Sequence, residues 1–303
     1  SLLLVLLTGL IMSVGMLRSM PFTVGTWSVN VPRSRPGQAG QATQPEGLST
    51  ARGARQHMAI SKNAPRSEFE KAARQGLLMP VDEIDGMLNP GNLFPFAEEM
   101  TLVKGTRYAF PFAGDALCMA YKPVQVAYPP TRWQEYIQPD AKAMAFPAAE
   151  PQGIMPLLLY RSLGGSFGAD ETVINLREDA LQESLRLLSD GANVNAFPYW
   201  LIDYTTFDQS WTALKDSNAT YAVVWTSQYL AELPENITLA NLPAPDDQPF
   251  TLADGWVLAF PQTSSEQLAR YQLLAQHLLD TVFQSSWTEA AGLLPVSEEV
   301  LLG

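Results

Sequence analysis

The chain changes character near residue 66, and this change limits what can fold. Residues 1–66 hold seven Lys or Arg and one Glu, a net charge of +6. Residues 67–303 hold 12 basic and 30 acidic residues, a net charge of −18. The first part also lacks the apolar periodicity of helices and strands, except for an alternating stretch at 23–31 that favours a short strand. We therefore expect the compact core to form from residue 67 onward.

The first 66 residues divide into two predicted segments. Residues 2–17 are a nearly unbroken apolar run that ends at Arg18. Such a run is short for a spanning helix and is typical of a secretory signal or an uncleaved anchor. Residues 19–66 are rich in Pro, Gly, Gln, Arg and Ser, which indicates a linker or the degenerate start of a domain. Residues 1–18 thus predict an extracytoplasmic protein, either exported or associated with the membrane through this segment.

Composition restricts the chemistry of the chain. Hydrophobic residues make up 47% and charged residues 17%, so a sizeable core can form. The net charge of −12 disfavours contact with a phosphate backbone and excludes nucleic acid as an expected partner. One cysteine, Cys118, allows no intrachain disulfide, and only His57 and His277 are present for imidazole chemistry. We expect no metal site and no cofactor.

Apolar spacing from residue 67 onward predicts an α/β fold in which helices and strands alternate, and this favours a largely parallel sheet. A helix at 177–190 is expected to stop at Gly191. A long helix is expected to begin with a capping box at Ser264. Its apolar stripe would comprise Leu268, Tyr271, Ala275, Leu278 and Val282. Further helices are predicted at 68–75, 130–138 and 204–215, and extended segments at 108–121, 222–225 and 256–260.

Catalytic signals are weak. Residues 164–168 (GGSFG) fit the G-x-S-x-G pattern, so a serine hydrolase that uses Ser166 with His277 as base is one hypothesis. That motif requires a helix directly after the serine, but residues 169–176 indicate a loop and a short strand. A glycine-rich turn is the favoured interpretation. Cys118 lies in an apolar stretch, and we expect it to be a core residue rather than a nucleophile.

Aromatic residues near predicted strand ends and turns give a stronger signal. Several lie beside acids or amides, as Trp200 does near Asp203 and Tyr204, and as Trp225 does near Tyr229. Sugars present apolar C–H faces and a rim of hydroxyl groups, so a sugar site needs aromatic platforms and polar acceptors. The alternative for each aromatic residue is a place in the core.

Seven segments carry a resemblance through their order along the chain. They are SEFEKAARQGLLMPVDEI (67–84), TRYAFPFAGDALCMAYKP (106–123), YPPTRWQEYI (128–137), the double glycine at 164–165, ATYAVVWTSQYL (219–230), ADGWVLAF (253–260) and WTEAAGLLPV (287–296). In this order they resemble the maltose-binding-type family (family 1) of extracytoplasmic solute-binding proteins, the capture subunits of ABC importers.

The resemblance implies an α/β, two-lobe, periplasmic-binding-protein-like fold with crossover strands at a hinge. Residues 67–121 would form part of the first lobe, 122–255 mainly the second lobe, and 256–303 the return to the first lobe with the C-terminal helices. A sugar or polyol would bind between the lobes without chemistry, and the closed form would deliver it to the permease subunits of the importer.

The resemblance also implies ligand-binding residues. Asp115 matches an acidic position that accepts hydrogen bonds from sugar hydroxyls, and Phe112 precedes it on the same crossover strand. Glu150 and Gln152 match a Glu-Pro-x turn at the cleft. The implied aromatic contacts are Tyr229, or Trp225 if the register is shifted, and Trp256, which follows a hinge glycine.

The chain departs from the family at its start. The first lobe of the family begins with strand–helix–strand–helix–strand, but only residues 18–66 precede the first matching segment here. We therefore expect a first lobe that is incomplete at its N-terminus. Three hypotheses stay open: a carbohydrate-binding importer subunit, which is not an enzyme; the serine hydrolase; and a degenerate relative that binds no ligand.

Overall fold

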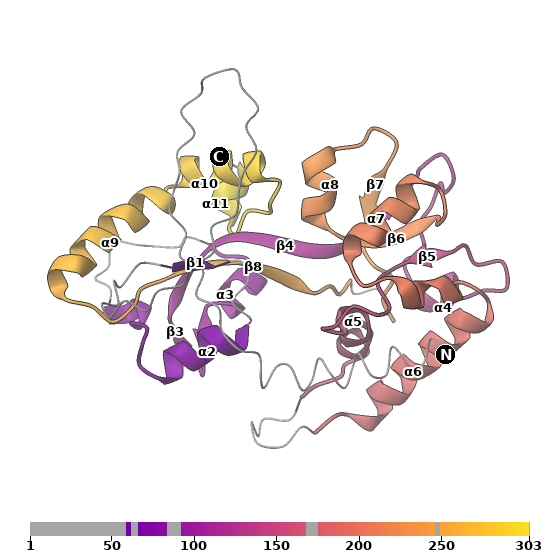
Figure 1. Ribbon diagram of the computed structural model, residues 1–303, viewed down its shortest axis with the longest axis horizontal. Helices are drawn as coiled ribbons and strands as arrows, with labels where there is room; N and C mark the ends of the chain where they lie inside the picture. The colour runs from indigo at the N-terminus through magenta and orange to yellow at the C-terminus, as the bar shows by residue number, and fades with distance from the viewer. Residues whose placement is uncertain (1–58, 62–65, 84–91, 168–174, 246–248, 303) are drawn as a thin grey trace, which may run out of the picture.

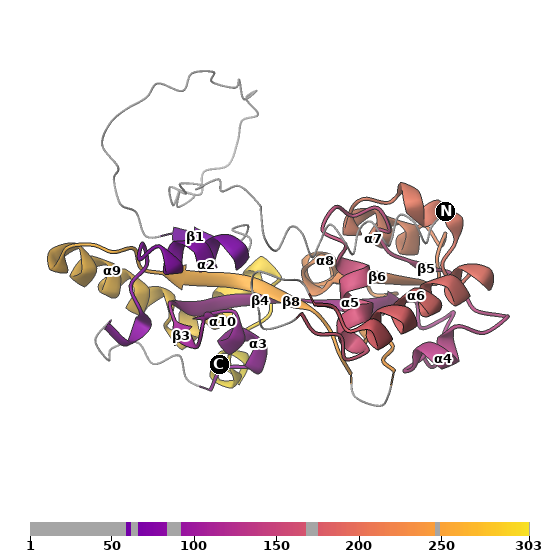
Figure 2. The ribbon, with the colours of Figure 1, turned by 90° about the horizontal axis from the view of Figure 1, so that it is seen from below.

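The computed structural model describes residues 59–61, 66–83, 92–167, 175–245 and 249–302. They form two lobes, which are joined by two strands that run side by side between them (Figures 1 and 2). These crossover strands are β4 (Ala109–Tyr121) and β8 (Ala253–Ala259). The predictions for the segments 1–18 and 19–58, including the strand at 23–31, lie outside the described residues.

One sheet runs through both lobes in the strand order β1-β8-β4-β6-β5, and β7 also pairs with β4. Among the described strand pairs, only β5 and β6 are parallel. The expected largely parallel sheet is therefore wrong for this part of the chain, because β4 pairs with β8, the strand that returns in the opposite direction. The remaining strands of this sheet are β1 (Ala59–Ser61), β5 (Met144–Ala145), β6 (Tyr221–Trp225) and β7 (Thr238–Ala240).

Helices pack around the part of the sheet in each lobe (Figure 1). The first lobe contains α2 (Arg66–Arg74), the turn η1 (Val81–Glu83), α3 (Pro95–Glu99), the hairpin β2 (Leu102–Val103) and β3 (Thr106–Arg107), α9 (Ser265–Leu278), α10 (Thr281–Ala291) and α11 (Glu298–Leu302). The second lobe contains α4 (Trp133–Tyr136), α5 (Ile154–Ser162), α6 (Glu178–Asn193), the turn η2 (Tyr199–Asp203), α7 (Phe207–Lys215) and α8 (Thr226–Glu232).

The lobes have separate cores. In the second lobe one large cluster surrounds Phe146 and Phe197, whose rings meet edge to face with centroids 5.2 Å apart. In the first lobe the buried residues divide into smaller clusters, one around Phe110 and Phe260 and another around Phe112. Burial of such rings is the main stabilising contribution in each lobe.

Two predicted helices have different ends in the structure. Helix α6 continues through Gly191 to Asn193, so the expected stop is wrong. A Cβ at Gly191 would lie 2.3 Å from a ring carbon of Phe197, so this glycine permits close packing instead of ending the helix. The helix expected at 130–138 is the single turn α4, because Arg132 still pairs as extended backbone with Ala244.

The long C-terminal helix predicted from Ser264 is two helices. Its start is confirmed, since Ser264 Oγ accepts a hydrogen bond from the Gln267 N–H at 3.5 Å. The helix ends at Leu278, and Asp280 then caps α10. The interruption removes Val282 from the expected apolar stripe, and this side chain is 70% exposed. No helix in the described part of the chain is long and apolar enough to cross a membrane.

Candidate ligand-binding site

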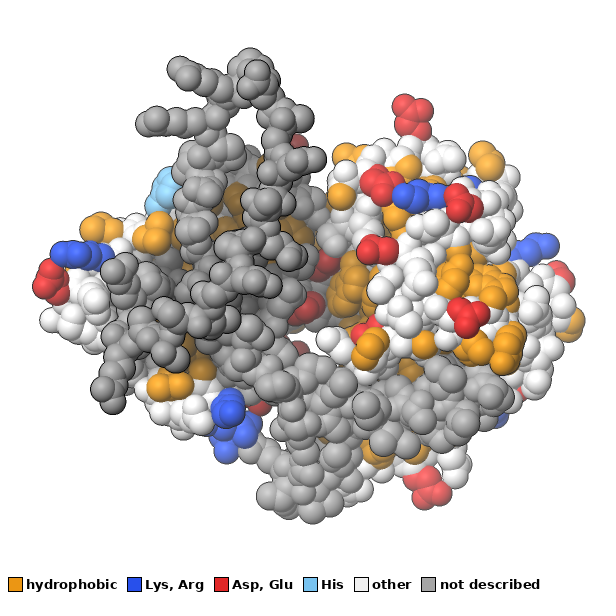
Figure 3. All heavy atoms as spheres, viewed as in Figure 1, with side chains coloured by type: hydrophobic (Ala, Val, Ile, Leu, Met, Phe, Trp, Pro, Cys, Tyr) orange, Lys and Arg blue, Asp and Glu red, His pale blue; other side chains and the backbone are white. Residues whose placement is uncertain are grey.

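Two pairs of segments in the second lobe are joined by hydrogen bonds, and one of them, α7 with α8, lies next to the crossover strand β4 through α8. The Ala149 N–H donates to the Tyr204 carbonyl at 2.9 Å, which joins the turn before α5 to η2. Gln228 Nε2 donates to Asp208 Oδ1 at 2.8 Å, which joins α8 to α7. In the space-filling view, apolar and acidic side chains line the margin of this lobe that faces the middle of the molecule (Figure 3).

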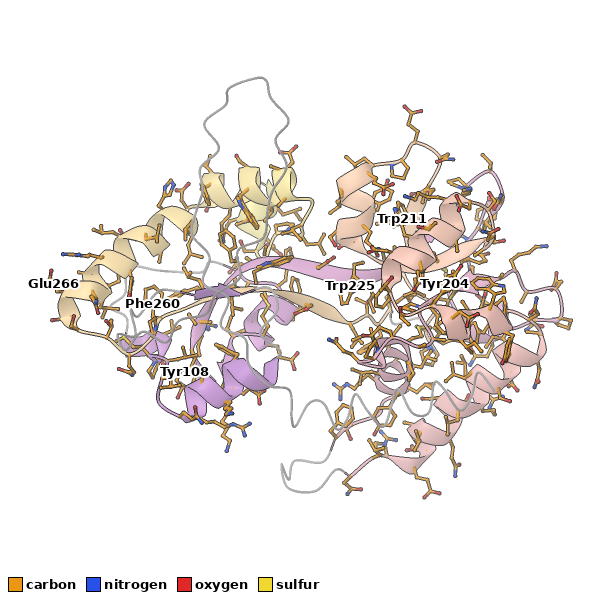
Figure 4. All side chains as sticks on the ribbon, in the orientation of Figure 1. Tyr108, Tyr204, Trp211, Trp225, Phe260 and Glu266 are labelled. Carbon is orange, nitrogen blue, oxygen red and sulfur yellow. The ribbon has the colours of Figure 1, made fainter. Side chains whose placement is uncertain are left out.

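Half-buried aromatic rings lie on these segments. The rings of Trp200 and Tyr204 have centroids 5.0 Å apart, and those of Phe207 and Trp225 are 5.7 Å apart. All four are only partly buried against the core of the second lobe. Figure 4 places Trp225 at the margin of this lobe next to the crossover strands. Rings in this state are anchored on one side and keep accessible area on another, as a sugar platform requires.

Helix α8 carries the two residues that were predicted as alternative platforms. Trp225 is its N-cap residue, and its backbone N–H donates to Gln228 Oε1 at 2.9 Å. Tyr229 lies one turn further along the helix and is also half-buried. The structure therefore leaves both predicted platforms partly accessible and places both on one short element.

Glu150 has a fixed orientation at the start of α5. Its carboxylate accepts hydrogen bonds from the Gln152 N–H at 2.9 Å and from the Ile154 N–H at 3.1 Å. Each carboxylate oxygen has two acceptor sites, so each retains capacity for a further donor. Glu150 is half-buried and Gln152 is exposed, so both predicted residues of this turn can meet a ligand.

Asp115 lies on β4 and is only 7% exposed. Its Oδ1 accepts hydrogen bonds from Thr226 Oγ1 at 2.7 Å, from the Ser227 N–H at 3.0 Å and from the Ala116 N–H at 3.0 Å. Its Oδ2 accepts one from Ser227 Oγ at 2.6 Å. The structure thus brings Asp115 next to the α8 segment, and four hydrogen bonds from within the protein already reach its carboxylate, three on Oδ1 and one on Oδ2.

Phe112 and Trp256 lie on the crossover strands β4 and β8, but their rings are buried in the first lobe. Phe112 is 3% exposed and its ring lies 4.7 Å from that of Trp287, while Trp256 is 9% exposed in the same cluster of the first lobe. Neither offers an open ring face, so we correct both from ligand platforms to core residues. Both faces of β4 are largely buried, so the alternation of the sequence could not distinguish an inward ring from a cleft-facing one.

Three residues near the site were missed as predicted contacts. Trp200 and Tyr204 were visible as an aromatic pair beside Asp203, but no sequence signal placed η2 against the turn at Glu150. Asp254 is exposed on β8 directly opposite Asp115, so their side chains leave the sheet on the same face. Only the strand register shows this pairing, because the two residues are far apart in the sequence.

The residues of the hydrolase hypothesis are far apart. Ser166 follows the end of α5 in the second lobe and is exposed, whereas His277 is exposed on α9 in the first lobe (Figure 1). Gly164 has a φ of 79° just after α5 ends, so the double glycine terminates a helix, as expected for a turn. The nucleophile-elbow arrangement, a strand before the serine, is not present at Ser166.

Cys118 is a core residue, as predicted. Burial and, to a smaller extent, the Asp115 charge raise the pKa of its thiol to about 12, so the thiolate is not formed near neutral pH. No group of three or more His, Cys, Asp or Glu side chains suited to a metal ion occurs in the described ranges.

The comparison with protein families identifies the class. The model of the bacterial extracellular solute-binding protein family matches residues 50–303. The chain therefore belongs to this family, as its segment order suggested. A search of curated protein sequences finds no match.

Solved structures confirm the two-lobe fold. The sugar-binding protein MalE of Xanthomonas citri has a TM-score of 0.63 and 18% identity over 76% of this chain and 64% of its own length. Maltose-bound MalE3 of T. maritima gives 0.61 and 17% over the same shares. The maltotriose-bound MalE domain of Bdellovibrio bacteriovorus gives 0.60 and 20%, over 79% and 67%. This chain thus spans about two-thirds of the length of these structures.

Proposed function

We propose that this protein is the substrate-capturing subunit of an ABC importer, which binds a carbohydrate between its lobes and delivers it to a membrane permease. It performs no chemistry on the ligand, uses no cofactor and acts outside the cytoplasm. Family membership supports the class, and the similar structures with bound maltose and maltotriose support the choice of ligand. The lobe boundaries proposed are 67–121, 122–255 and 256–303.

One observation carries the proposal for a sugar: half-buried aromatic rings lie next to an oriented carboxylate on the second lobe. Ring area comes from Trp225 at the end of β6 and Tyr229 on α8, and from Trp200 on η2 and Tyr204 directly after it. Glu150 supplies acceptors beside them, because the Ala149–Tyr204 hydrogen bond joins its turn to η2. Apolar C–H faces pack on the rings while hydroxyl groups donate to the carboxylate.

The proposed contacts are therefore Trp225, Tyr229, Glu150 and Gln152, together with Trp200 and Tyr204. Asp254 adds a further acceptor from the crossover strand β8. The proposed contacts include two acids, Glu150 and Asp254, and no Lys or Arg. This favours neutral sugars or polyols over anionic solutes. A cationic ligand such as a polyamine is the second chemistry that rings with acids can hold.

A thermal-shift screen of the full chain tests the proposal. The panel contains maltose, maltotriose, monosaccharides, polyols and polyamines. A ligand at 100 times its dissociation constant adds about 2.7 kcal/mol to the free energy of unfolding, which raises the melting temperature by several degrees. We expect such a shift with at least one neutral sugar.

Other outcomes contradict the proposal in different ways. A shift with polyamines alone would replace the ligand class and keep the capture function. A cooperative transition that no compound shifts would support a degenerate relative that binds no ligand. Turnover of a sugar during incubation would contradict the absence of chemistry.

A further inference from the structure

The Asp115 carboxylate connects the crossover strand β4 to the start of α8, which carries two of the proposed ring contacts. We propose that Asp115 is a positioning residue: it fixes α8, and with it Trp225 and Tyr229, against β4, and it does not itself contact the ligand. This inference rests on the proposed function for its ligand-binding consequence, but its structural part can be tested without a ligand.

The acceptor sites of Asp115 support this role. Four hydrogen bonds from within the protein reach this carboxylate at 2.6–3.0 Å, which fills Oδ1 and leaves one acceptor site on Oδ2. Three of the four converge on Oδ1, and the side chain is 7% exposed. A sugar hydroxyl on Oδ1 would have to displace a donor from Thr226 or Ser227. A buried donor left without a partner loses its hydrogen bond without hydration in return.

The start of α8 needs an acceptor from another part of the chain. Its N-cap residue is Trp225, and an indole donates but cannot accept a hydrogen bond. The side chains usual at this position, Ser, Thr, Asp or Asn, would satisfy an N–H of the first turn themselves. Here Asp115, 112 residues earlier in the sequence, accepts from the Ser227 N–H instead. Its negative charge also suits the positive end of the helix.

The consequence is a rigid link between the hinge and one side of the site. The strand pairing Leu117↔Trp225 fixes the end of β6 beside β4, and the Asp115 bonds extend this link into the first turn of α8. Without them, α8 would be held mainly by its contacts with the second-lobe core, and the orientation of Trp225 and Tyr229 would be less defined. Loss of this preorganisation weakens binding without loss of a ligand contact.

A double-mutant cycle with maltotriose as the probe tests the inference. The arms are Asp115→Ala, the pair Thr226→Val/Ser227→Ala, and all three changes together. We expect Asp115→Ala to weaken binding roughly tenfold and the Thr226/Ser227 pair to weaken it less, because the Ser227 N–H still donates to Asp115 in the pair. The combined variant should be no weaker than Asp115→Ala, because the pair removes only bonds that Asp115→Ala also removes. Asp115→Asn should stay within about threefold of the wild type, since Asn caps helices as well as Asp. Asp140→Ala, at an exposed position after α4, is the matched control.

A direct contact between Asp115 and the sugar would give different results and would overturn the inference. If Asp115 contacts the sugar directly, Thr226→Val/Ser227→Ala will leave affinity unchanged, or its effect will add in full to that of Asp115→Ala. Asp115→Asn will then lose as much affinity as Asp115→Ala.

Hydrogen exchange of the ligand-free full chain separates this inference from the proposed function. We expect the amides of residues 227–232 to exchange roughly tenfold faster in Asp115→Ala, and at the wild-type rate in Asp115→Asn and Asp140→Ala. Unchanged exchange in Asp115→Ala would contradict the positioning role even if sugars bind. If Asp115→Ala does not fold, the Thr226→Val/Ser227→Ala variant replaces it, with a smaller expected increase in exchange because the Ser227 N–H bond to Asp115 remains. If no probe binds, the proposed function fails and this measurement still decides the role of Asp115.

Discussion

In the first lobe the rings of Phe112, Trp256 and Phe260 are buried, whereas in the second lobe those of Tyr204 and Trp225 are only half-buried. Figure 4 shows Phe260 within the first lobe and Trp225 at the edge of the second. A ring that is fully buried stabilises its lobe and has no area left for a ligand. The first lobe also has half-buried rings, those of Tyr271, Phe283 and Trp287, but the proposed aromatic contacts are those of the second lobe.

The hydrophobic cores of the two lobes also differ in size. The second lobe has one large cluster of buried residues and a small one around Tyr160, and the described part of the first lobe has only small ones. A large continuous core can hold surface rings in fixed orientations, which is what a binding site on a rigid scaffold requires. The difference between the lobes leads to four predictions, which range from large losses of stability to no effect.

The largest expected effect is on the second-lobe core. Phe197→Ala should lower the free energy of unfolding by about 3–5 kcal/mol, because it empties a site that is 1% exposed between Phe146 and Trp133. Chemical denaturation followed by circular dichroism measures this loss. Tyr128→Ala, at a position that is 91% exposed, is the control and should be near wild type. If Phe197→Ala lowers the free energy of unfolding by less than about 1 kcal/mol, the large core of the second lobe is not tightly packed around this ring.

A first-lobe ring should affect stability but not binding. Phe112→Leu should cost about 1 kcal/mol of stability, since it replaces one buried apolar side chain with a smaller one beside Trp287. Sugar affinity should stay within about twofold, because a core residue makes no ligand contact. Denaturation and titration of the same preparation measure both. Weaker binding at unchanged stability would restore Phe112 to the ligand-contacting set.

The Lys215–Glu232 ion pair in the second lobe should contribute a small part of the free energy of unfolding, which is lost at acidic pH. Hydrogen bonds from Lys215 and then from Trp211 lower the pKa of Glu232. A carboxyl with a lowered folded-state pKa contributes stability above its usual pKa, and this is lost as the pH falls through the folded value. The side chains are 36% and 46% exposed, so the contribution should not exceed about 1 kcal/mol. Glu232→Gln should remove this part of the pH dependence of unfolding, and an unchanged profile would contradict it.

The smallest effect is expected at Ser166. Ser166→Ala should change stability by less than about 0.5 kcal/mol, because the side chain is exposed and its carbonyl, not its hydroxyl, accepts from Tyr160 Oη. Sugar binding should be unchanged. An esterase assay on wild type and variant is the check: an activity that Ser166→Ala abolishes would revive the hydrolase hypothesis.

Local patterns predicted much of the fold. The spacing of apolar residues gave α2, α6, α7 and the start of α9, and the order of short segments gave the family and the two lobes. The errors occurred where distant residues decide the structure. Gly191 lies inside a helix because Phe197 packs against it, and β4 is antiparallel to β8 because the chain crosses back between the lobes.

The candidate site was predicted only in part, again because contacts between distant residues are not visible in the sequence. Glu150, Trp225 and Tyr229 keep accessible surface on the second lobe, so they remain proposed contacts. Asp115 was identified as important, but its partners Thr226 and Ser227 are more than 100 residues away, so its hydrogen bonds could not be read from the sequence. Whether the predicted residues contact a ligand stays a prediction.

Calorimetric titration of maltotriose into the full chain and into Trp225→Ala tests sugar binding at the proposed aromatic site, with Tyr128→Ala as the matched aromatic control. The account predicts one sugar bound per chain, an affinity at least about tenfold weaker in Trp225→Ala, and no change in Tyr128→Ala. Equal affinities in all three proteins, or no binding by a cooperatively folded wild type in the whole sugar panel, would contradict it.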